Sequence, residues 1–334
     1  MNFKYLIGNQ NLYLKTIYHI NQMGRMNTEE ITIKLINRLQ WFFFKRDFLR
    51  IFHDDPELVH SSRIQRFYVF RSVRKNAENY YCYYKGKKAG MLSIRTNRGS
   101  EVFIYGIGVE EEFRRKGIGK FMMDFTEERA KKLKKKFIAL AVTTKNDPAI
   151  NLYKKTRYSF LGEGMTYISI FKEKIESKEQ YKTELKPIKN YDSKARLAVA
   201  KFRLGEIESI SSQLGIQYMK ENRMDGYHNS IRNFIQKGIG NLFLISYNSK
   251  DVGCILFIDR LNIRSITIYL EDDIWNIDFI NEIAYLIKNI KRNKEIEKFV
   301  FRVSLHKADN LIDIESFSFK RDRSRDKYLM FKKI

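Results

Sequence analysis

The sequence has few cysteines and prolines and no long apolar run. Its only cysteines, Cys82 and Cys254, are too few for a disulfide framework or a cysteine-based metal site. The three prolines, Pro56, Pro148 and Pro187, leave no proline-rich linker. The start "MNFKYLIGNQNLYLK" lacks the apolar core of a signal peptide, and no run approaches the roughly 20 apolar residues of a membrane span. We therefore expect a cytoplasmic protein that does not cross a membrane.

The histidines are few as well, and their positions do not fit a metal site. None of them shows the spacing of metal ligands, and no cysteine stands near any of them: His19, His53, His60, His228 and His306. Since a zinc site needs several such ligands close together, we expect no bound metal ion.

Positive charge is what the sequence has in excess. The formal net charge is +24, and residues 1–176 carry 34 Lys and Arg against 18 Asp and Glu, whereas the remaining residues carry 29 against 21. Apolar residues make up 43% of the chain, enough for a core in each of two domains. Two interpretations of the charge stay open. It reflects only a composition rich in Lys, Ile and Asn, or it attracts an anionic ligand, a nucleic acid or an acidic protein.

Two stretches of the chain repeat the same order of expected elements. Residues 79–94 and 241–258 each consist of two apolar strands around a polar turn, which predicts a hairpin. A helix is expected before each hairpin, at residues 63–76 and 227–238. After each hairpin a strand, an amphipathic helix and further strands are expected, ending with "YISIFKE" in one case and "KYLMFKK" in the other. The matching order predicts an internal duplication.

The duplication predicts two α/β domains of one fold. Gly90 and Gly253 stand at matching positions, and the charged stretch "KEKIESKEQYKT" separates the halves. We expect the first domain within residues 1–176 and the second within residues 180–334. Residues 1–60 receive no assigned element.

Only the first half contains the basic, glycine-rich segment "RRKGIGK", which follows a strand and precedes a helix. The first amides of such a helix lack intrahelical partners and carry the positive end of the helix dipole, so that they bind phosphate. Gly117 and Gly119 let a ligand approach the backbone. The basic residues around them are Arg114, Arg115, Lys116 and Lys120. The spacing fits neither a nucleotide P-loop nor a dinucleotide fingerprint, and an ordinary structural turn stays the alternative.

The segment from Val109 to Gly119, V-x-x-x-x-R-R-K-G-I-G, resembles the acetyl-CoA signature of the GCN5-related N-acetyltransferases (GNAT). A second block, "VTTKNDPAINLYKKTRYSFLGE", is similar to the next motif of that family. The residues in the positions of that motif are Asn146, Ala149, Leu152 and Tyr153. The resemblance implies two tandem GNAT-like units, each a mixed, mostly antiparallel central sheet flanked by helices, with a degenerate second unit. Residues 1–60 would then be a helical extension or elements on the acceptor side.

The resemblance implies an acetyl-CoA-dependent N-acetyltransferase, an acyltransferase active in its first unit, in which an amine attacks the thioester directly. The pyrophosphate of coenzyme A would lie on the amides of the basic turn, and its pantetheine arm would pair with the preceding strand. The residues implied in cofactor binding are Ile107, Gly108, Val109, Arg114, Arg115, Lys116, Gly117, Ile118, Gly119, Lys120 and Asn146. Gly106 and Gly108 fit the close approach of the arm, although a strand-end bulge also uses glycines. Asn146 would cap its helix or touch the arm.

Two residues are candidates for proton transfer. In the family, the tyrosine at the position of Tyr153 often protonates the departing thiolate, although simple packing on the apolar face of its helix is the alternative. Glu101 is the candidate general base, because direct carboxylate bases of the family tend to occur where this sequence has Phe103. Strand alternation places Glu101, Phe103 and Tyr105 on one face. A water relay, with Glu101 as a surface residue, is the alternative.

The acceptor is expected to be an amine on a small molecule, a peptide or a protein, since acceptor contacts come from variable loops. The alternative function is a non-catalytic, regulatory protein of the same fold that binds acetyl-CoA, or that engages a polyanion or nucleic acid through its basic surface. The lysine-rich run at residues 131–136 is expected to be a solvated helix end, with a nucleic-acid patch as the alternative.

Overall fold

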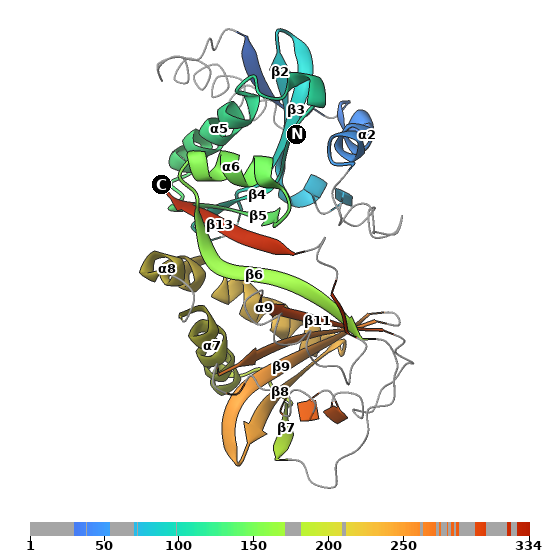
Figure 1. Cartoon of the computed structure of the whole chain (residues 1–334), viewed down its shortest axis with the longest axis vertical. Helices are drawn as coiled ribbons and strands as arrows, with labels where there is room; N and C mark the ends of the chain where they lie inside the picture. Colours follow the sequence, from blue (N-terminus) through green and yellow to red (C-terminus); the bar gives the residue numbers. More distant parts are fainter. Residues whose placement is uncertain are drawn as a thin grey trace, which may run out of the picture. The chain divides into compact units, whose positions relative to one another are not determined.

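The computed structural model describes residues 30–37, 39–53, 70–71, 73–97, 99–170, 182–208, 212–260, 263–271, 274, 279, 282–283, 285–286, 298–304, 319–321 and 326–334. The chain divides into two units, one made of residues 1–140 with 333–334 and the other of residues 141–332. Figure 1 labels most of their helices and strands. The domain boundary expected near residues 176–180 stays a prediction.

The strands of the first unit follow the order β1-β2-β3-β4-β5. Their bounds are β1 (Ile31–Leu35), β2 (Glu78–Tyr84), β3 (Lys87–Arg95), β4 (Glu101–Val109) and β5 (Phe137–Thr143). Neighbouring strands are antiparallel except β4 and β5, which are parallel. The hairpin predicted at residues 79–94 is the β2–β3 pair, and its turn contains Gly86 with a left-handed φ of 78°.

Helix α5 (Ile118–Lys132) covers one face of this sheet. It follows the short 3₁₀ helix η1 (Glu111–Phe113) and buries apolar residues at helical spacing, among them Phe121 and Met122. A Cβ added to Gly90 of β3 would lie 3.4 Å from the terminal methyl group of Met122. This face therefore carries the helix that the basic turn precedes.

Helix α2 (Trp41–Ile51) covers the opposite face. It buries Phe44, Phe48 and Ile51, which follow one another at the spacing of one helical side. A Cβ added to Gly108 of β4 would meet the side chain of Ile51. Gly90 pairs with Val109, so both face the side of the sheet that α5 covers, whereas Gly108 points to the other side. Helices α2 and α5 therefore lie on opposite sides of the sheet.

The strands of the second unit follow the order β13-β6-β11-β10-β9-β8-β7, and β12 also pairs with β6. Their bounds are β6 (Ser159–Ile170), β7 (Thr183–Ile188), β8 (Gly240–Tyr247), β9 (Lys250–Arg260), β10 (Ile263–Leu270), β11 (Lys298–Ser304), β12 (Phe319–Arg321) and β13 (Lys327–Lys333). The helices are α6 (Asp147–Lys155), α7 (Ser193–Glu208), α8 (Gln213–Asn222) and α9 (Met224–Gln236). Among the described strand pairs of this second unit, only β10 and β11 are parallel.

The pairing of the strands confirms the predicted duplication. β2, β3, β4 and β5 lie in the same order and orientation as β8, β9, β10 and β11. The predicted fold class, tandem units with mixed, mostly antiparallel sheets flanked by helices, is confirmed as well. Of the predicted helices, residues 227–238 correspond to α9, whereas residues 63–76 lie partly outside the described residues. None of the helices described is long and apolar enough to cross a membrane.

Strand β6 pairs with two strands from the second half of the sequence. Its first part pairs with β13, where Phe160 faces Met330, and its last part pairs with β11. In the first unit, the backbone N–H of Ile334 donates a hydrogen bond of 2.9 Å to the carbonyl of Lys136. Periodicity predicted both β6 and β13, but not that the last strand of the chain would pair with a strand of the first half.

Candidate functional site

The turn predicted to bind phosphate lies between η1 and α5. Gly117 is the N-cap of α5 and has a left-handed φ of 78°, a conformation that glycine adopts without strain. Arg115 also has a positive φ, of 62°. No side chain caps this helix, so its first amides keep their hydrogen-bonding capacity. Together with the helix dipole, this geometry suits an anion.

The basic side chains of the turn are all exposed: Arg114, Arg115, Lys116 and Lys120. Phe113 is buried and anchors the start of the turn. The Lys116 ammonium lies 5.2 Å from the ring centres of both Phe113 and Tyr84. Lys120 forms an exposed ion pair of 2.5 Å with Asp124, one helical turn later. The positive charge is therefore on the solvent side of the turn, where a phosphate can reach it.

Strand β4 has its parallel partner β5 over only part of its length. The register with β5 runs from Glu101 to Ile104, whereas the register with β3 continues to Val109. The residues predicted to receive the pantetheine arm, Ile107 to Val109, lie beyond the part of β4 that pairs with β5. An extended ligand can hydrogen-bond to such a strand edge.

A β-bulge interrupts β4 where its pairing with β5 ends. Ile104 pairs with Ile94 and Gly106 pairs with Ser93, so Tyr105 is the extra residue. The bulge moves the positions that face α2 from Glu101 and Phe103 to Gly106 and Gly108. Simple alternation along the whole strand does not hold, and sequence reasoning did not predict this change.

The two glycines of β4 leave room for helix α2. A Cβ added to Gly106 would lie 3.3 Å from Phe52, directly after α2, and one added to Gly108 would lie 2.3 Å from Ile51. The second distance is far below van der Waals contact, so a side chain at Gly108 would displace the helix. The structure thus explains both glycines by helix packing. Their backbone contact with a cofactor stays a prediction.

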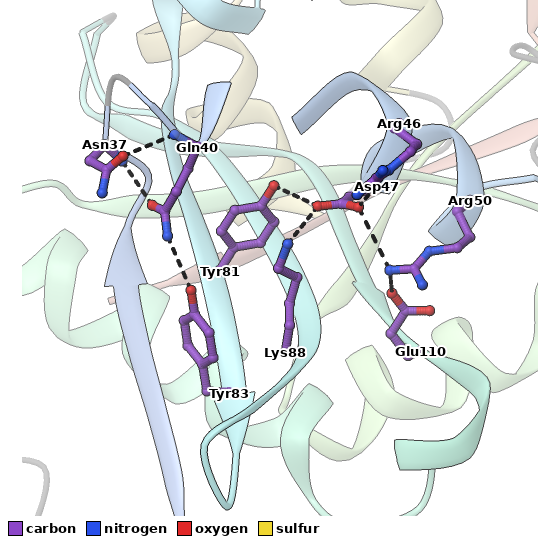
Figure 2. Close-up of polar contacts among 9 residues, drawn as sticks. All are labelled: Asn37, Gln40, Arg46, Asp47, Arg50, Tyr81, Tyr83, Lys88 and Glu110. Carbon is purple, nitrogen blue, oxygen red and sulfur yellow. Dashed lines mark hydrogen bonds and ion pairs between the residues drawn. The ribbon is translucent and has the colours of Figure 1, made fainter. Parts of the chain in front are cut away.

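Figure 2 shows a polar network that attaches α2 to the sheet. The buried carboxylate of Asp47 accepts hydrogen bonds of 2.6 Å from Lys88 and 2.8 Å from Tyr81. Burial by itself would raise the pKa of Asp47, but the hydrogen bonds from Lys88 and Tyr81 outweigh it and the pKa is lowered. Arg50 of the same helix pairs at 2.5 Å with Glu110, the residue directly after β4. Sequence reasoning missed this network, because Asp47 and its two hydrogen-bond donors lie 34 and 41 residues apart in the chain.

Glu101, the candidate general base, is the first residue of β4 and is only 1% exposed. Its carboxylate accepts a hydrogen bond of 2.7 Å from Arg95, which also donates to the hydroxyl oxygen of Tyr105 at 3.1 Å. The alternative that Glu101 is an ordinary surface residue is wrong, because Glu101 is buried. Its role as a base stays a prediction.

Tyr153 and Asn146 belong to helix α6 of the second unit and its N-cap. Tyr153 is 6% exposed, and its ring centre lies 6.1 Å from that of Tyr158. Burial raises the pKa of Tyr153, so its hydroxyl stays protonated at neutral pH. The Asn146 side chain accepts a hydrogen bond of 3.2 Å from the amide of Ala149, which confirms the predicted helix cap. The roles of both residues toward a cofactor stay predictions.

Both cysteines are free and buried. Burial raises the pKa of the Cys82 thiol to about 12, and a protonated thiol is a poor nucleophile. Among the residues that the structure describes, no group of three or more His, Cys, Asp or Glu side chains could hold a metal ion.

Comparison with known proteins links this site to one family. Residues 38–157 match the model of the acetyltransferase (GNAT) family. The uncharacterized N-acetyltransferase YdgE of Bacillus subtilis (strain 168) is 39% identical over 59 residues, a match that covers 18% of this chain and 38% of that relative.

Solved structures show the same fold over nearly the whole chain. A GCN5-related N-acetyltransferase from Sphaerobacter thermophilus superposes with a TM-score of 0.54 at 11% identity, covering 91% of this chain and 95% of the other. A tandem GNAT protein from the clavulanic acid biosynthesis pathway gives a TM-score of 0.50 at 10% identity, covering 91% and 98%. At these identities the likeness shows the fold alone.

Proposed function

Because residues 38–157 match the model of the acetyltransferase (GNAT) family, we propose that the chain is an N-acetyltransferase that moves an acetyl group from acetyl-CoA to an amine. The observation that carries the proposal is the exposed basic turn at the N-terminus of α5, with Gly117 in a left-handed conformation and no side chain capping the helix. Its three adjacent exposed cations repel one another, and a bound phosphate would offset that repulsion.

The residues present fit coenzyme A. The amides from Gly117 to Lys120 and the side chains of Arg114 and Arg115 would hold the pyrophosphate, since guanidinium groups match phosphate oxygens. The backbone from Ile107 to Val109 would pair with the pantetheine arm, beyond the part of β4 that pairs with β5. When bound, acetyl-CoA supplies an acetyl thioester that a neutral amine can attack.

Two residues of the chain would then move protons. Tyr153 would protonate the leaving thiolate, and its raised pKa keeps the proton on the phenol until the thiolate forms. Glu101 would accept a proton from the amine, either directly or through water. The ion pair with Arg95 gives Glu101 a structural task as well.

The second half of the chain would lack a cofactor site of its own. Its β10 corresponds to β4, but the segment between Ile268 and Phe279 has no counterpart of "RRKGIG". We therefore expect one coenzyme A per chain, and two equivalent sites in a calorimetric titration would contradict this part of the proposal.

Free coenzyme A is the product to measure. The protein would be incubated with acetyl-CoA and a panel of amines and peptides, and release of the thiol would be followed with a thiol reagent. A non-catalytic acetyl-CoA binder, the second candidate function, would be stabilised thermally by coenzyme A without releasing thiol from acetyl-CoA. Stabilisation by heparin but not by coenzyme A would favour a polyanion-binding protein. The exposed lysines of the 131–136 run support this second possibility.

A further inference from the structure

Aromatic rings occupy the side of β4 that faces α2, next to the β-bulge. The rings of Phe103 and Tyr105 meet edge to face, with centres 5.5 Å apart. Tyr105 is 39% exposed, although β4 lies inside the sheet. Phe52 adjoins the next residue, Gly106. We call Phe52, Phe103 and Tyr105 the β4 aromatic surface.

Arg95 contacts both Phe103 and Tyr105 and hydrogen-bonds to the Tyr105 hydroxyl. Arg95 is 8% exposed, and its guanidinium carbon lies 5.2 Å from the ring centre of Phe103 and 5.4 Å from that of Tyr105. The guanidinium donates a hydrogen bond of 3.1 Å to the Tyr105 hydroxyl oxygen. An arginine donates hydrogen bonds but cannot accept them. The proton of the Tyr105 hydroxyl is therefore not used in this contact, and the hydroxyl can donate it to a ligand.

The carboxylates on the same side of the sheet are already paired with cations. The three ion pairs are Asp47 with Lys88, Glu101 with Arg95, and Glu110 with Arg50. None of these three carboxylates is therefore available to form an ion pair with a second ammonium group of an acceptor. The excess of positive charge in the first half of the sequence would also repel it.

We propose that the β4 aromatic surface binds the acceptor and selects a monoamine that carries a flat apolar ring with a hydrogen-bond acceptor. The ring would lie against Phe103 and Tyr105, and the Tyr105 hydroxyl would donate to the acceptor atom. The position is suitable, because Tyr105 stands where the pairing of β4 with β5 ends, and Val109 lies about 13 Å further along the strand toward the basic turn. This inference rests on the proposed function, which puts the cofactor along that stretch of β4.

The test compares acceptors of different shape and charge. The probes are 4-methoxyphenethylamine, phenethylamine, spermidine and kanamycin, each with acetyl-CoA. We expect the highest kcat/KM for 4-methoxyphenethylamine. Tyr105→Phe keeps the ring and should raise KM for 4-methoxyphenethylamine roughly tenfold, with little change for phenethylamine. Tyr105→Ala should raise KM for both, while the Kd of coenzyme A in calorimetry stays the same. Faster turnover of spermidine or kanamycin than of either aromatic amine would overturn the inference.

Direct binding separates this inference from the proposed function. Saturation-transfer NMR would detect 4-methoxyphenethylamine on the protein saturated with coenzyme A, whether or not turnover occurs. If the amine binds in a Tyr105-dependent manner but no amine releases coenzyme A, the proposed function fails and the aromatic site stands. If turnover occurs and Tyr105→Ala changes neither KM nor the NMR signal, the aromatic site is wrong and the acetyltransferase stands.

Discussion

Arg95 on β3 donates a 2.7 Å hydrogen bond to Glu101 on β4, in an ion pair that is almost completely buried. At the equivalent hairpin of the second half, Arg264 on β10 donates two hydrogen bonds of 2.7 Å to Asp259 on β9. The arginine and the acid have thus exchanged strands between the two halves. An ion pair that is present twice with opposite polarity indicates a structural contribution to the hairpin, because a general base would need its carboxylate on one particular strand.

Glu101→Gln should lower the free energy of unfolding by about 3–5 kcal/mol, because it leaves the buried Arg95 without its counter-ion. Urea unfolding followed by circular dichroism measures the loss. Asp259→Asn is the matched control, with a similar loss expected because it leaves Arg264, whose side chain is only 1% exposed, without its counter-ion. If Glu101 is also the general base, Glu101→Gln lowers kcat/KM much more than Asp259→Asn does. A Glu101→Gln variant as stable as the parent would contradict the structural role.

Gly117→Glu should weaken coenzyme A binding roughly 100-fold relative to Gly117→Ala, as measured by calorimetry. Both substitutions strain the left-handed backbone at this position, where φ is 78°, by a similar amount of about 1–2 kcal/mol. Only the glutamate adds a negative charge next to the phosphates, so the comparison separates charge from strain. Equal affinities of the two variants would show that the turn does not hold the pyrophosphate.

Tyr153→Phe should lower kcat by about 100-fold and leave the Kd of coenzyme A unchanged. The ring and its contact with Tyr158 remain, whereas the acidic proton is lost. Pre-steady-state kinetics would establish that the chemical step limits the rate. Full turnover of the variant under that condition would assign Tyr153 to packing alone.

Acidification should destabilise the second unit through His228. This side chain is buried, and its Nδ1 lies 2.5 Å from the hydroxyl oxygen of Tyr191. Burial, followed by the charge of Arg196, lowers the pKa of His228 in the folded state. Below the unfolded pKa of about 6.5 the unfolded chain binds more protons, so stability is present above that pH and is lost as the pH falls toward the folded pKa.

Urea unfolding at about pH 7.5 and pH 5.5 tests this dependence, with a loss of at most about 1.4 kcal/mol per pH unit for the single proton. His228→Gln, which cannot be protonated, should show a smaller difference between the two pH values. The same difference in the parent and in the variant would mean that other groups cause the acid sensitivity.

Phe331→Ala should cost about 3–5 kcal/mol of stability, because Phe331 of β13 is 1% exposed and stacks on Tyr218 of α8 with ring centres 5.3 Å apart. Lys333→Ala, at an exposed position of the same strand, should change stability by less than about 0.5 kcal/mol. Chemical unfolding of the two variants compares them directly. A small loss in both would show that β13 contributes little to the packing of the unit.

Local sequence patterns predicted the helices, strands and turns. The features that could not be predicted depend on contacts between residues that are distant in the chain. The hairpin around Gly86 and the turn at Gly117 have signals within a few residues, so both could be located from the sequence. The bulge at Tyr105 depends on the register with β3, which alternation along β4 does not contain. Ile51 packs against Gly108, although the two residues are far apart in the chain. The sequence therefore shows that position 108 is a glycine but not that helix α2 packs against it.

The pairing of β6 with β13 also sets an order of events during synthesis. β6 ends at Ile170 and β13 begins at Lys327. At roughly 5–20 residues per second, about 8 to 30 s pass on the ribosome before the partner of the first part of β6 has been made. During that interval β6 carries an unpaired edge, which is prone to aggregation and to capture by chaperones. The nascent chain therefore reaches this strand pairing only after residues 327–333 have left the ribosome.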